Sequence, residues 1–74
     1  MIRIKANDPA GWRIKPPGPD SLRGKVVALA LTCDGKSNDE FMMRCRVIPE
    51  FRSTGESAAT WLRWLQKQNI VRLA

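Results

Sequence analysis

Three short stretches of this 74-residue chain alternate apolar residues with cations, and this alternation restricts the possible folds more than any other feature. The stretches are residues 2–5, 12–15 and 43–46. Successive side chains of a β-strand point to opposite faces, so each stretch predicts a strand with one apolar face and one cationic face. In a shared sheet, six cations would cover one side: Arg3, Lys5, Arg13, Lys15, Arg44 and Arg46.

The apolar run 25–32, KVVALALT, has no polar residue at alternate positions. Such a run favours a central strand that is covered on both faces, or one whose outer side carries small residues. We expect residues 41–48 to pair with it as a hairpin across the turn-rich segment 33–40. In the register that buries both apolar faces, Cys33 and Cys45 lie too far apart for a disulfide, so both are expected as free thiols.

The C-terminal third changes to helical spacing. Ser53 and Glu56 match the Ser-x-x-Glu pattern of a capping box. Apolar residues then recur at intervals of three and four, namely Ala58, Trp61, Leu62 and Leu65. The spacing predicts an amphipathic helix over residues 54–68 that ends at Asn69. Residues 70–73 are expected to add an edge strand.

Two tryptophans lie on this predicted helix. Trp61 falls within the apolar stripe and is expected to fill the core beneath the sheet. Trp64 falls at the edge of the stripe, beside Arg63 and Lys67. Two interpretations of Trp64 remain open: a core residue, or an exposed anchor for a partner, because Trp is frequent at interface hot spots.

Together these patterns predict a single α+β domain over residues 1–74. The expected fold is a small twisted antiparallel sheet of three to four strands, with one C-terminal amphipathic helix packed on one face. The length and the 43% apolar content suit one small core. In its order of elements over residues 12–68, this arrangement resembles the DNA-binding modules of tyrosine-recombinase arm domains and AP2-type factors. The resemblance implies a three-stranded sheet that lies on the major groove.

Several classes of protein are disfavoured by the residues present. The chain has no histidine and two cysteines, whereas a structural zinc site needs about four Cys or His ligands. The usual base for a Ser or Cys nucleophile is also missing, so we expect no enzyme and no cofactor. The longest uncharged apolar run, residues 26–33, is far shorter than the roughly 20 residues that cross a bilayer. The first residues are too polar for a signal peptide, which favours a cytoplasmic protein with no membrane partner.

The net charge of +6 indicates an anionic partner. We therefore expect a non-enzymatic small basic regulator of a nucleic-acid transaction, with transcription as the first choice. Its cationic sheet face would bind nucleic acid, and a duplex is favoured over a single strand because no aromatic stacking platform shares that face. The candidate binding residues are Arg3, Lys5, Arg13, Lys15, Arg44, Arg46 and Trp64.

An alternative function uses the same cations against a protein. In this interpretation the chain is a phage-type inhibitor or modulator that docks on a host nucleic-acid machine, such as RNA polymerase or a nuclease complex. It would bind an acidic surface of that machine without contacting nucleic acid itself. Small chains with no enzyme chemistry are typical of such regulators.

Overall fold

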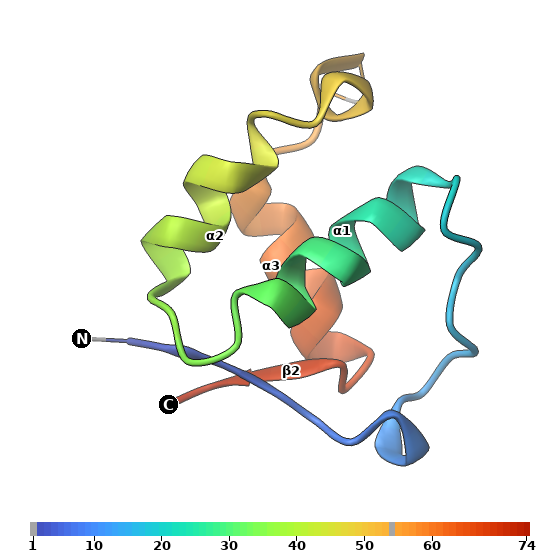
Figure 1. The fold of residues 1–74 in the computed structure, drawn as a ribbon, viewed down its shortest axis with the longest axis vertical. Helices are drawn as coiled ribbons and strands as arrows, with labels where there is room; N and C mark the ends of the chain where they lie inside the picture. The colour runs from blue at the N-terminus through green and yellow to red at the C-terminus, as the bar shows by residue number, and fades with distance from the viewer. Residues whose placement is uncertain (1, 54) are drawn as a thin grey trace.

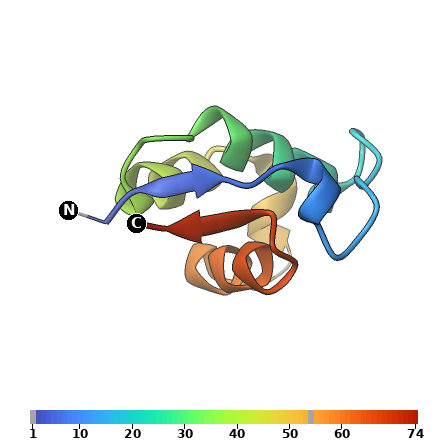
Figure 2. The same ribbon diagram turned by 90° about the horizontal axis from the view of Figure 1, so that it is seen from below.

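A computed structural model describes residues 2–53 and 55–74, and within them three α-helices surround a small core. In chain order the elements are β1 (Ile4–Ala6), the 3-10 turn η1 (Pro9–Gly11), α1 (Leu22–Thr32), α2 (Asn38–Cys45), the 3-10 turn η2 (Pro49–Ser53), α3 (Ala58–Lys67) and β2 (Val71–Leu73). Helices α1 and α2 form one layer and α3 lies behind them (Figure 1). The two strands close one end of the molecule, as Figure 2 shows.

Strand β1 is hydrogen-bonded along both of its edges. On one edge it pairs with β2 in antiparallel register, with Lys5 opposite Arg72. On the other edge it meets the turn between α1 and α2, where the Ile4 N–H donates to the Lys36 carbonyl at 2.8 Å. The Gly35 N–H donates back to the Ile4 carbonyl at 2.7 Å. Segments from the beginning, middle and end of the chain therefore lie side by side (Figure 1).

Each of the three helices begins after a serine whose hydroxyl caps it. The N-cap residues are Ser21 for α1, Ser37 for α2 and Ser57 for α3. Each Oγ accepts the backbone N–H three residues further on, at 3.0, 3.3 and 3.2 Å respectively. Such a bond satisfies one of the N–H groups that the first helical turn leaves without a partner, and its loss typically destabilises a helix by about 1 kcal/mol.

The predicted central strand is wrong, because residues 25–32 belong to α1. The buried residues of this segment recur at helical spacing, with one face inward: Val26, Val27, Ala30 and then Cys33. An apolar run of this length fits a buried helix as well as a buried strand, so its composition does not distinguish the two. With the central strand gone, the predicted sheet of three to four strands is replaced by the two-stranded β1–β2 ribbon.

Two of the three predicted cationic strands, at residues 12–15 and 43–46, are also wrong. Most of the segment 41–48 lies in α2, where Phe41 and Cys45 are buried one helical turn apart. Residues 12–15 form an irregular segment with bends. The six cations therefore do not share one sheet face, and the likeness to DNA-binding modules with a three-stranded sheet is lost with that sheet.

The C-terminal helix and the final strand are present, as α3 and β2. Asn69 ends the helix with a positive φ of 61°, the left-handed conformation expected of it. The predicted start was too early, because the helix begins at Ala58 and its cap is Ser57. The proposed capping box is wrong for this reason, since Ser53 belongs to η2. Thr54, where we placed the start of the helix, lies outside the described residues.

The core is a single cluster to which every helix and both strands contribute. Ile4, Phe41 and Leu65 have no exposed surface, and Val71 is 1% exposed. Trp61 is 7% exposed, which confirms its expected place in the core. Its indole N–H is buried and has no hydrogen-bond partner among the described residues, so Trp61 stabilises the fold through packing.

Replacement of Trp61 by alanine is expected to lower the free energy of unfolding by about 3–5 kcal/mol, because a cavity remains where the indole packed. Urea denaturation followed by circular dichroism measures this change. Leu31→Ala is the matched control, since Leu31 is 39% exposed and its truncation leaves no closed cavity. Equal midpoints for Trp61→Ala and the wild type would place the indole outside the core.

Gly24, in the first turn of α1, lets the proline-rich segment 16–20 lie directly on the helix. A Cβ atom at Gly24 would stand 1.9 Å from the Gly18 carbonyl oxygen and 2.8 Å from the Gly18 carbonyl carbon. The same carbonyl accepts hydrogen bonds from the backbone N–H and the hydroxyl of Ser21. The Gly18 carbonyl therefore cannot move away from Gly24 without breaking its hydrogen bonds to Ser21, the N-cap of α1.

Gly24→Ala is expected to destabilise the protein by about 1–3 kcal/mol through this overlap. The sign is opposite to the gain of about 1 kcal/mol that alanine normally brings over glycine within a helix. Gly18→Ala is the control, because a Cβ atom there meets nothing within 4 Å. Thermal unfolding of both variants tests the prediction, and a stabilised Gly24→Ala protein would contradict it.

Candidate nucleic-acid interface

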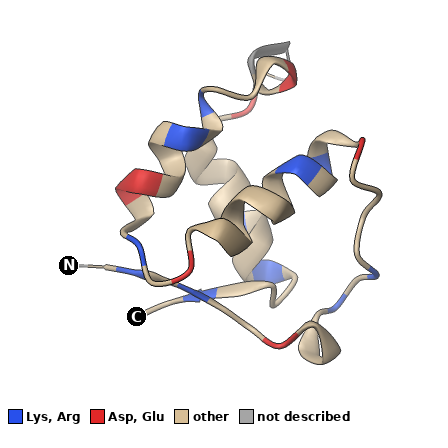
Figure 3. Ribbon diagram, viewed as in Figure 1, with Lys and Arg blue, Asp and Glu red and all other residues tan. Residues whose placement is uncertain are grey.

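Four acidic residues make contacts within the fold, and Figure 3 shows where acidic and basic residues lie along the chain. Asp8 and Asp34 accept backbone N–H groups, from Ala10 and Ala6 respectively, each at 2.9 Å. Glu40 pairs with Arg44 one helical turn away in α2, and Glu50 pairs with Lys25 of α1.

Four of the predicted site residues lie on the N-terminal segment, at the strand end of the molecule. Arg3 and Lys5 flank Ile4 of β1, and the Arg3 guanidinium donates to the Gly35 carbonyl at 2.7 Å. Arg13 and Lys15 are exposed. The backbone N–H of Arg13 donates to the Gln68 carbonyl at 2.8 Å, which holds this segment beside the C-terminal end of α3.

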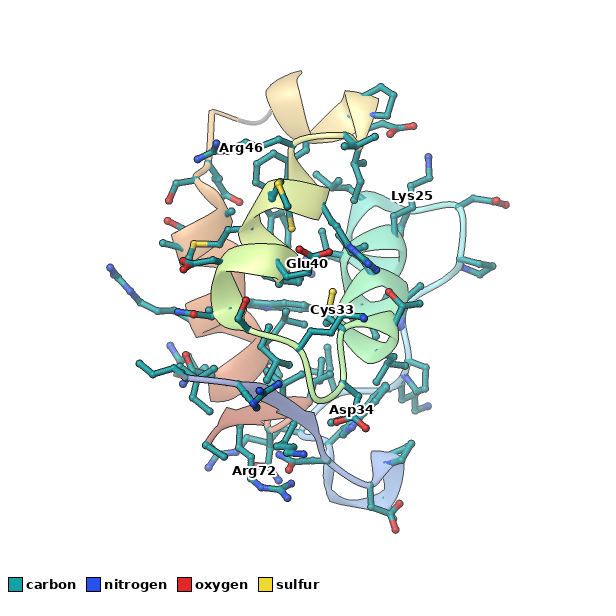
Figure 4. All side chains as sticks on the ribbon, turned by 60° about the vertical axis from the view of Figure 1, so that its left-hand side comes forward. Lys25, Cys33, Asp34, Glu40, Arg46 and Arg72 are labelled. Carbon is teal, nitrogen blue, oxygen red and sulfur yellow. The ribbon has the colours of Figure 1, made fainter. Side chains whose placement is uncertain are left out.

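The other two predicted cations, Arg44 and Arg46, belong to α2 and its C-cap. Arg44 donates from Nε to Glu40 Oε1 at 2.9 Å, so its charge is already paired. Arg46 and Arg72, both labelled in Figure 4, lie at opposite ends of the molecule. The structure therefore divides the predicted binding residues into two separate groups.

Trp64 is half-buried between two neighbours. Its ring meets Trp61 edge-on, with centroids 5.6 Å apart and planes at 80°. The Arg23 guanidinium of α1 lies 5.7 Å from the Trp64 ring centroid, in a cation–π contact. The indole thus links α3 to α1, and it carries a cation at its surface.

The outward face of α3 is a candidate binding surface that we did not predict from the sequence. The exposed residues of this helix are Ala59, Thr60, Arg63, Gln66 and Lys67. At about 100° per residue they fall within an arc of about 120°, with Arg63 near its middle. None of them is acidic. The signal was present in the helical spacing, because the predicted apolar stripe already placed Arg63 and Lys67 on the solvent side.

This face of α3 continues into the strand ribbon. The helix ends at Lys67, and the chain turns at Asn69 directly into β2. On the ribbon, Lys5 and Arg72 are opposite one another and alternate with the inward-facing Ile4 and Val71. We use the name basic face for the outward side of α3 and the ribbon, with the cations Lys5, Arg13, Arg63, Lys67 and Arg72.

An apolar groove of about 790 Å³ lies between α1 and the segment that follows α2. Leu29, Val47 and Ile48 line it, and the charged side chains at its rim are engaged in ion pairs. The hydrogen bond from Lys25 lowers the pKa of Glu50, so this pair contributes stability at neutral pH that is lost as the pH falls through that lowered value.

No group of three residues able to hold a metal ion occurs in the described part of the chain.

Cys33 and Cys45 are both free and fully buried, which confirms the expected thiols. The reason given for them was wrong, because Cys33 is the C-cap of α1 and Cys45 is the last residue of α2, so neither lies on a strand. Burial raises the pKa of Cys45 to about 12, and Cys33 adds to this effect. At physiological pH the Cys45 thiol therefore stays protonated and unreactive.

Both thiols are expected to resist a water-soluble disulfide reagent at pH 8 while the protein is folded. In denaturant they should react at the rate of a free cysteine, because the barrier is burial. Absorbance of the released thiolate measures both rates. Modification of either cysteine on the time scale of free cysteine in the native protein would contradict this prediction.

Comparison with protein-family models, curated proteins and solved structures gave no match to this chain. In the described residues, no helix is long and apolar enough to cross a membrane.

Proposed function

We propose that this protein is a non-enzymatic regulator of a nucleic-acid transaction, with transcription as the first choice, and that it binds duplex nucleic acid. The observation that carries the proposal is the basic face, in which α3 exposes cations with no acid on the same arc. Positive charge gathered on one surface attracts a polyanion and displaces its counterions. A cytoplasmic setting is part of the proposal, because free thiols are the rule in reducing compartments.

A duplex is favoured by the shape and composition of the basic face. A helix of ten residues is about 15 Å long, and the major groove of DNA, about 12 Å wide, admits an α-helix. Binding of single strands usually relies on aromatic stacking, and none of the residues that form the basic face is aromatic. Trp12, which lies near it, is half-buried and donates its indole N–H to the Asn7 carbonyl at 3.2 Å.

The alternative is docking on an acidic surface of a nucleic-acid machine such as RNA polymerase. Val47, which is 78% exposed beside the apolar groove, favours this function, because it offers an apolar contact to a protein partner. Affinity capture from a nuclease-treated lysate, followed by binding to the purified captured machine, tests this alternative directly.

Binding of a labelled 20-base-pair duplex should weaken steeply as salt is added. If the five cations of the basic face each neutralise a phosphate, the logarithm of the association constant falls against the logarithm of salt with a slope of about −4 to −5. Lys5→Gln with Arg72→Gln should reduce this slope by about 2. Fluorescence anisotropy across a salt series gives both values.

Arg44→Gln with Arg46→Gln is the matched control, because it removes the same charge from the opposite end of the molecule. We expect it to change the slope by less than about 1, since neither residue belongs to the basic face. Equal effects of the two double variants would contradict binding through the basic face. A salt-independent affinity, or no binding to the duplex, would contradict the proposed function itself.

A further inference from the structure

Arg63 is an exposed residue of α3 whose charge is available to a partner. It lies near the middle of the outward arc, opposite the buried Trp61 and Leu65. In the part of the chain that the structure describes, no hydrogen bond or ion pair holds its guanidinium. An arginine in this position keeps all its donors for a partner.

The neighbours of Arg63 along the same arc also suit recognition of base edges. Gln66 lies one turn after Arg63 and is exposed. Ala59 lies one turn before Arg63, and its side chain is only a methyl group. Arginine pairs with two acceptors of guanine, glutamine pairs with adenine, and a small residue allows close approach of the helix. Helices α1 and α2 lie on the other side of α3, so neither obstructs this arc (Figure 2).

Cations lie at one flank of the arc and at its C-terminal end. Arg23 of α1 lies over the Trp64 ring on one flank. At the C-terminal end, Lys67 and Arg13 lie near the turn into β2. Glu56 precedes α3 and lines a depression with Arg23, so the positive charge is strongest toward the C-terminal half of the helix. Phosphates that border a groove would meet these cations.

We propose that α3 is a reading helix that enters the major groove of DNA and makes binding sequence-specific. In this arrangement Arg63 contacts O6 and N7 of a guanine and Gln66 contacts the adjacent region of the site, while Lys67, Arg13 and the ribbon cations hold phosphates. The inference rests on the proposed function and adds to it the class of target, B-form DNA with a guanine at one position. The deep, narrow major groove of an RNA duplex excludes a helix in this role.

The test is selection from a pool of DNA duplexes with a randomised 16-base-pair core, followed by sequencing. The wild type should enrich a motif that contains an invariant guanine. Arg63→Lys keeps the charge but loses the paired donors, so its selected motif should lose that guanine. On the motif selected by the wild type, Arg63→Lys should bind about tenfold more weakly than the wild type. Its affinity for an unselected duplex of fixed sequence should stay within about twofold.

Arg46→Lys is the matched control and should select the wild-type motif, because Arg46 lies beside Gly55 and Glu56, before the N-terminal end of α3, and does not belong to the outward arc of this helix. Salt-dependent binding of the pool without enrichment of any motif would overturn the inference and leave the proposed function standing. An enriched motif that Arg63→Lys leaves unchanged, or equal binding of an RNA duplex, would also overturn the reading helix. No binding to any duplex would overturn both proposals.

Discussion

The double-sided hydrogen bonding of β1 is the interaction on which the rest of the structure depends. One edge takes β2 from the end of the chain, and the other takes Gly35 and Lys36 from the turn between α1 and α2. Ile4, at the centre of this arrangement, is completely buried. A three-residue strand has few backbone bonds of its own, so its stability comes from these long-range partners and from the helices packed on its inner side. The same pairing brings the C-terminal end of α3 next to the ribbon and thereby creates the basic face.

Several acidic residues stabilise local structure instead of pairing with the cations of the basic face. Asp8 caps η1, Asp34 holds the edge of β1, and Glu40 pairs within α2. A carboxylate that accepts a backbone N–H or pairs locally compensates for an otherwise incomplete local structure. The outward arc of α3 needs no such support, because Ser57 caps the helix and its stability comes from the buried stripe. Cations could therefore gather there without a neutralising partner.

Much of the local structure could be predicted from particular residues, and the errors have a common origin. The strand near Ile4, the amphipathic helix around Trp61 and the left-handed Asn69 were predictable from spacing and residue type. The stretch 43–46 alternates as a strand would, yet it ends a helix, since Phe41 and Cys45 bury a single face. Ser37 and Glu40 carry the same Ser-x-x-Glu pattern that we assigned to Ser53 and Glu56. In this case the pattern marks the start of a helix, α2. For the site, the outward position of Arg63 was predictable, whereas the separation of Arg46 from the ribbon was not.

By itself, the sequence determined the apolar stripe of α3, the turn at Asn69 and the excess of positive charge, because the first two depend on neighbours within a few residues and the third on composition. Only the tertiary structure decided that residues 25–32 form a helix and that β1 pairs with β2. An alternating pattern specifies which side chains face inward but contains no information about the partner strand, and an apolar run is buried equally well in either conformation. Which cations lie together follows from that long-range pairing, and so the basic face became visible only in the folded chain.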